Sequence, residues 1–100
     1  MTNNVTSEAI YEQTAIIVSQ ALMIKPSVIT PSSRLFSDLG AESIDLLDIR
    51  FRIEKQFAFK IEDGEMIKSL GQDLDRDLID KYLTVKSIAD FVEQRLQANV

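Results

Sequence analysis

The chain has 100 residues and a mass of 11.3 kDa, which suits one compact domain, residues 1–100, with a single hydrophobic core. Its composition, 45% hydrophobic and 27% charged, is that of a globular protein rather than a disordered one. It contains no cysteine and no histidine, which excludes a thiol nucleophile, a disulfide, a zinc cluster and a serine–histidine–aspartate triad. An enzyme of this composition would have to work with carboxylates, lysines and tyrosines alone, and we expect that the protein is not an enzyme.

The net charge of −5 is concentrated in the middle of the chain. Residues 36–80 carry twelve acidic and six basic residues, whereas residues 1–35 are neutral and residues 81–100 carry +1. Such a surface repels phosphate backbones and attracts basic proteins, so we expect protein partners and no nucleic acid. The first residues lack a basic signal region, and the most apolar run, residues 15–24, is too short to span a bilayer. These features predict a cytoplasmic protein without a membrane span, and we expect a monomer.

The first predicted helix is capped by Thr6 or Ser7, runs to about Met23 and ends before Pro26. Its stripe at helical spacing consists of Ala9, Ile10, Gln13, Ile16, Ile17, Ala21 and Ile24. The connection that follows runs to Gly40, and loops longer than ~12 residues are usually functional. Five apolar residues predict that this connection is packed on the core: Val28, Ile29, Leu35, Phe36 and Leu39.

The second predicted helix, residues 43–57, has two apolar stripes. At ~100° per residue, one stripe suits the core and comprises Leu46, Ile49, Ile53 and Phe57. The other lies roughly 150° away, close to Asp48, and comprises Ile44, Leu47 and Phe51. A helix on the outside of a bundle buries one stripe, so the second is available to another helix or to a transient protein partner.

Two further helices follow. Residues 57–61 alternate, but without a partner strand we interpret them as an extended loop. Apolar residues recur every four positions at Leu70, Leu74, Leu78 and Tyr82, which predicts a short helix around residues 73–82. Thr84 then caps a last helix whose apolar face comprises Val85, Ile88, Val92 and Leu96. The predicted fold class is all-α: a small four-helix bundle with three longer helices, a short third helix and a long first loop.

An apparent calcium motif lies in the predicted third helix. Asp73, Asp75 and Asp77 have the first spacings of an EF-hand loop, but Leu78 and Thr84 replace its glycine and glutamate. We interpret these aspartates as a solvated acidic face and predict no metal site.

Ser43 begins the second helix. Taken alone, a serine there is a capping residue, and it is no nucleophile because no neighbouring base can activate it. Because Ser43 follows a glycine turn and is surrounded by acidic residues, we expect its hydroxyl to be exposed. Another enzyme could attach a group to such a hydroxyl.

Residues 36–49, which include D-L-G-A-E-S-I at 38–44, resemble the attachment segment of acyl carrier proteins, and the similarity resumes at residues 83–92. The resemblance implies a four-helix bundle in which Ser43 carries 4′-phosphopantetheine derived from coenzyme A. It implies flanking roles for Asp38, Leu39, Gly40, Glu42 and Ile44. The thiol of the arm would hold acyl groups as thioesters for enzymes of fatty-acid and lipid biosynthesis. Implied partners are a phosphopantetheinyl transferase and acyl-loading, elongating or acyltransferase enzymes with basic docking surfaces.

Two sets of residues are assigned on this basis. The expected partner face comprises Ile44, Asp45, Leu47, Asp48 and Phe51. The expected acyl pocket comprises Leu46, Ile49, Ile53, Leu74, Leu78 and Ile88, with Leu70 and Tyr82 as further candidates.

The chain departs from the family pattern in three ways, and two alternatives stay open. Glu42 and Ile44 replace aspartate and leucine, Arg50 and Arg52 add positive charge, and residues 66–82 contain extra length. The extra length favours a carrier that is specialised for unusual or long acyl groups. The alternatives are a stand-alone peptidyl, aminoacyl or polyketide carrier, and an unmodified acidic helical adaptor that binds a basic partner through Leu47 and Phe51.

Overall fold

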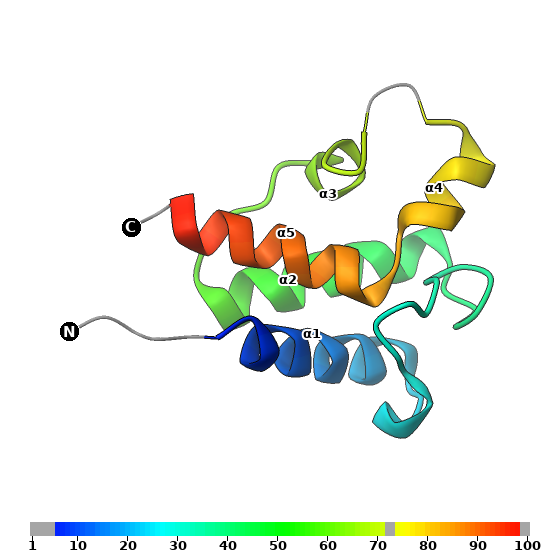
Figure 1. Ribbon diagram of the computed structural model, residues 1–100, viewed down its shortest axis with the longest axis horizontal. Coiled ribbons are helices and arrows are strands. Elements are labelled where there is room, and N and C mark those ends of the chain that lie inside the picture. Colours follow the sequence, from blue (N-terminus) through cyan, green and yellow to red (C-terminus); the bar gives the residue numbers. More distant parts are fainter. Residues whose placement is uncertain (1–5, 72–73, 99–100) are drawn as a thin grey trace.

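The computed structural model describes residues 6–71 and 74–98, and these residues form helices and no strands (Figure 1). The elements are α1 (Ser7–Leu22), the 3-10 turn η1 (Pro26–Val28), α2 (Ser43–Phe57), α3 (Glu65–Lys68), α4 (Arg76–Tyr82) and α5 (Val85–Ala98). The predicted all-α bundle is confirmed. The short helix α3 is additional to the four predicted helices, because four residues leave no periodic apolar pattern in the sequence.

Helix α1 packs against both α2 and α5 (Figure 1). The core contains side chains from these three helices, together with side chains from α3 and the connecting segments. The core stripe predicted for α2 is confirmed, since Ile49 and Ile53 are fully buried and Leu46 and Phe57 pack against them. The stripe predicted for α1 is wrong at Ile16, which is exposed, while Thr14 is buried. Helices α3 and α4 lie on the side of the bundle away from α1, where they border α2.

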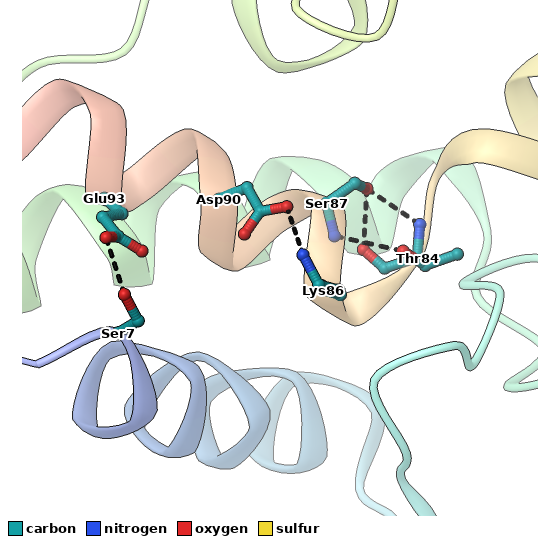
Figure 2. A network of polar contacts seen from close by, with 6 residues as sticks. All are labelled: Ser7, Thr84, Lys86, Ser87, Asp90 and Glu93. Carbon is teal, nitrogen blue, oxygen red and sulfur yellow. Dashed lines mark hydrogen bonds and ion pairs between the residues drawn. The ribbon is translucent and has the colours of Figure 1, made fainter.

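The N-terminal caps of α1 and α5 are the predicted threonines. Thr6 caps α1, because its Oγ1 accepts a hydrogen bond from the Ala9 N–H at 3.0 Å. At the start of α5, the Ser87 N–H donates to Thr84 Oγ1 at 3.1 Å and the Thr84 N–H donates to Ser87 Oγ at 2.9 Å (Figure 2). Capping side chains of this kind satisfy backbone donors that have no partner within the helix.

One polar contact on this face joins α5 to α1, and another lies within α5. The Ser7 hydroxyl donates to Glu93 Oε2 at 2.7 Å, and Lys86 pairs with Asp90 at 2.9 Å (Figure 2). The hydrogen bond to Asp90 raises the pKa of the Lys86 ammonium.

Two predicted features lie around α4. The predicted third helix begins at Arg76 rather than at Asp73, and Asp73 lies outside the described residues. Asp75, part of the apparent calcium motif, caps α4: its carboxylate accepts a hydrogen bond from the Leu78 N–H at 2.9 Å. The loop predicted for residues 57–61 is confirmed only in part. Residues 59–61 belong to neither a helix nor a strand, but Phe57 is the last residue of α2 and Ala58 is its left-handed C-cap, with φ 60°.

The long first connection is packed on the core, as predicted. Ile29 and Leu35 are buried and Phe36 and Leu39 are partly buried, but Val28 is 56% exposed, contrary to the prediction. Backbone hydrogen bonds fix this connection to the junction of α4 and α5. The Leu35 N–H donates to the Leu83 carbonyl at 3.0 Å, and the N–H groups of residues 85 and 86 donate to the carbonyls of residues 33 and 31.

We predict that Leu35→Ala lowers the free energy of unfolding by about 3 kcal/mol, because it opens a cavity in a fully buried site. Val28→Ala, in the same connection but exposed, should change it by less than about 0.5 kcal/mol. Urea denaturation of the three proteins measures both values. Equal effects of the two substitutions would contradict a packed connection.

Candidate functional site

A closed turn, residues 34–41, precedes α2 and sets its starting point. The Asp38 N–H donates to the Arg34 carbonyl at 3.1 Å, and Asp38 Oδ2 accepts from the Arg34 N–H at 2.8 Å. The Ala41 N–H donates to the Leu35 carbonyl at 2.8 Å and closes the turn. Gly40 has φ +73°, and a Cβ there would meet nothing within 4 Å, so glycine is favoured by the backbone conformation and not by lack of space.

Ser43 is the first residue of α2 and is not its cap. The cap is Glu42, whose N–H donates to Asp45 Oδ2 at 2.8 Å. The interpretation of Ser43 as a capping residue is therefore wrong. Its side chain is exposed, and within residues 6–71 and 74–98 its hydroxyl has no hydrogen-bond partner. An exposed hydroxyl at the positive end of a 15-residue helix tolerates an attached anion.

Two grooves meet at Ser43. The larger, here called the α4 groove, has a volume of about 690 Å³ and lies between the start of α2 and α4. It is lined by Phe36, Ser37, Glu42, Ser43, Leu46, Ile67, Arg76, Asp77, Ile79 and Asp80. The smaller, the α3 groove, has a volume of about 160 Å³ and is lined by Ser43, Leu46, Leu47, Arg50, Glu62, Asp63, Gly64, Met66, Ile67 and Leu83. Both grooves combine Ser43 with apolar side chains in their lining.

The structure brings only one of the expected acyl-pocket residues to these grooves. Leu46 lines both, whereas Ile49, Ile53 and Ile88 are buried in the core and line neither. Leu74 packs beside Gly71, and Leu78 is exposed on α4.

The apolar lining that the sequence analysis missed comes from separate segments, notably Phe36, Ile67 and Ile79. The four-residue spacing used in the prediction follows the exposed face of α4, which carries Leu78 and Tyr82. The adjacent Ile79 packs against the core. Residues three positions apart lie on the same face of a helix, and Arg76 and Ile79 mark the face of α4 that lines the groove.

The exposed stripe of α2 is present as predicted. Ile44, Leu47 and Phe51 are 64%, 40% and 55% exposed, on the opposite side of the helix from Ile49 and Ile53. We call these three residues the apolar α2 face.

The charges beside the apolar α2 face are paired within the chain. Asp48 forms an ion pair with Arg52 at 2.9 Å, and Asp45 is occupied by the helix cap. Arg50 pairs with Asp63 at 3.2 Å and lies 5.0 Å from the centre of the Phe51 ring. The face therefore offers less free negative charge than the sequence count suggests.

Asp80 joins α4 to the turn before α2. Its Oδ1 accepts from the Ser37 N–H at 3.0 Å, and its Oδ2 lies 3.8 Å from Arg34 Nη1. These contacts hold α4 in place as one wall of the α4 groove.

We predict that Asp80→Ala increases amide hydrogen exchange in α4 and lowers the free energy of unfolding by about 1–2 kcal/mol, because a charged hydrogen bond is lost. Asp77→Ala removes a carboxylate from the same groove, but no hydrogen bond or ion pair of Asp77 is found within the described residues, so exchange in α4 should stay near that of the wild type. Equal exchange in the two variants would contradict the role of Asp80.

Comparisons with known proteins agree with this arrangement. The family model for the phosphopantetheine attachment site matches residues 13–72, which include the turn, Ser43 and all of α2. The acyl carrier protein of Thermotoga maritima is 29% identical over 89 residues, 89% of this chain and 94% of that protein.

Two proteins named acyl carrier protein AcpXL are also similar. That of Rhizobium etli is 42% identical over 53 residues, 53% of this chain and 58% of that protein. That of Brucella melitensis is 28% identical over 90 residues, 88% of this chain and 92% of that protein. Among residues 6–71 and 74–98, every helix is too short or too polar to form a transmembrane segment. The chain belongs to the acyl carrier protein family, whose members are carriers rather than catalysts and hold acyl groups on a covalently bound 4′-phosphopantetheine arm.

Proposed function

We propose that Ser43 is the residue to which the 4′-phosphopantetheine arm is attached. The observation that carries the proposal is the position of its exposed hydroxyl, on the first turn of α2 and at the junction of two grooves. Helix-end N–H groups favour the negative charge of a phosphodiester. The fit is supported further by the absence of a partner for this hydroxyl within the described residues.

The proposed attachment requires a phosphopantetheinyl transferase and coenzyme A. The Ser43 oxygen forms a bond to the phosphorus that bears pantetheine, and the pyrophosphate bond of coenzyme A breaks. Adenosine 3′,5′-bisphosphate leaves, and the hydroxyl proton passes to a base of the transferase. The chain has no histidine and no cysteine, which is consistent with its role as a substrate in this step.

The two grooves beside Ser43 support a binding site for the carried group on the protein surface. The bound arm supplies a thiol that holds the acyl group as a thioester. Leu46, Ile67 and Ile79 offer apolar surface for the acyl chain, and burial favours each CH₂ by ~0.8 kcal/mol. The relatives are named acyl carrier proteins, which supports an acyl group over a peptidyl or polyketide one.

Biosynthetic enzymes that use the carrier would bind the apolar α2 face beside Ser43. Ile44 and Leu47 lie within one turn of Ser43, and Phe51 extends the same surface by a further turn. A carrier must dissociate after each reaction, which fits a small apolar contact with charged edges. A cytoplasmic location and a single domain over residues 1–100 stay part of the proposal.

We predict that the wild-type protein gains one phosphopantetheine when it is incubated with coenzyme A and a transferase, and that Ser43→Ala gains none. Ser37→Ala is the matched control, because Ser37 is exposed and lines the same groove. Intact mass spectrometry measures the gain, and circular dichroism checks folding. A loaded Ser43→Ala variant would overturn the assignment, and an unmodified wild-type protein would favour the adaptor function.

We predict that Asp48→Lys slows modification by the transferase at low salt, because it places a cation where a basic enzyme docks. The effect should shrink as salt is added, since charges are screened over about 8 Å at physiological ionic strength. Asp90→Lys is the matched control, because Asp90 also belongs to an exposed ion pair four residues apart, on α5. If the two variants react at equal rates across the salt series, docking on α2 is wrong.

A further inference from the structure

The α4 groove is mostly negative, and the proposed modification adds further negative charge to it. Its charged lining comprises Glu42, Asp77, Asp80 and a single cation, Arg76. A phosphodiester on Ser43 would carry one negative charge beside these carboxylates. Like charges at short range repel each other, so positive groups in the grooves at Ser43 should stabilise the modified protein.

Each groove that meets Ser43 contains one arginine, and the two arginines differ. Arg50, in the α3 groove, is largely buried, pairs with Asp63 at 3.2 Å and lies over the Phe51 ring. Arg76, in the α4 groove, is exposed on the first turn of α4 and forms no ion pair within residues 6–71 and 74–98. The Asp80 carboxylate, on the same groove wall, is engaged by Ser37 and by Arg34.

We propose that Arg76 binds the phosphodiester formed at Ser43 and so positions the arm along the α4 groove rather than the α3 groove. This inference rests on the proposed attachment at Ser43. A guanidinium presents paired N–H donors that match two phosphate oxygens, and it stays charged throughout the physiological pH range. Arg76 acts as a positioning residue: it holds the first part of the arm, and the apolar lining of the same groove then lies nearest to the acyl chain.

The test compares wild type, Arg76→Gln, Arg76→Lys, Arg50→Gln and the matched control Lys81→Gln, each before and after loading. Lys81 is a cation on α4 that does not line the groove. Intact mass confirms loading. The readouts are the ³¹P chemical shift of the phosphodiester and the change in Tm on loading, and neither depends on acyl transfer.

We expect the change in Tm on loading to be more favourable in wild type than in Arg76→Gln by about 2–5 °C at low salt. The difference should disappear at high salt, since the pair is exposed. Arg76→Lys should retain part of it, and Lys81→Gln should match the wild type. The ³¹P resonance should move in Arg76→Gln and stay unchanged in Lys81→Gln.

Two outcomes would overturn the inference without affecting the proposed function. One is that all loaded variants show the same change in Tm and the same ³¹P shift as the loaded wild type. The other is a ³¹P shift that moves in Arg50→Gln and not in Arg76→Gln, which would place the arm in the α3 groove. A wild-type protein that gains no mass would instead overturn the attachment at Ser43 itself, so the two failures are distinguishable.

Discussion

The site depends on a short backbone pairing between the first connection and the junction of α4 and α5. Three hydrogen bonds join residues 31–35 to residues 83–86, with an isolated bridge between Arg34 and Thr84. Leu35 and Leu83, next to this bridge, are both buried, so the paired segments are anchored to the core by their side chains. Because the pairing fixes residues 31–35, it also fixes the turn at residues 34–41 and therefore the start of α2.

The same pairing brings α4 next to Ser43. Helix α4 ends at Tyr82, immediately before the paired residues, and Asp80 ties it back to the turn through Ser37 and Arg34. The α4 groove is thus bounded by segments that are held by one set of contacts.

Local contacts reduce the free negative charge that α2 presents. The sequence places four acidic residues and no basic one between residues 36 and 49, which predicts a strongly acidic surface. In the structure Asp38 and Asp45 accept hydrogen bonds from backbone N–H groups, and Asp48 pairs with Arg52. The exposed side of α2 therefore combines the apolar α2 face with a partly neutralised edge. Arg52 neutralises Asp48 on α2 itself, whereas Arg50 pairs with Asp63 outside the helix.

The sequence by itself determined the helices with clear periodicity, the position of Ser43 and the two stripes of α2. These features depend on local spacing and on caps such as Thr6 and Thr84, whose contacts span only a few residues. Only the tertiary structure decided which residues line the grooves, because Phe36, Ile67 and Ile79 come from a turn and two short helices that are distant in sequence. It likewise decided that Ile49, Ile53 and Ile88 belong to the core, since a helical wheel identifies an apolar face but not the segment that covers it.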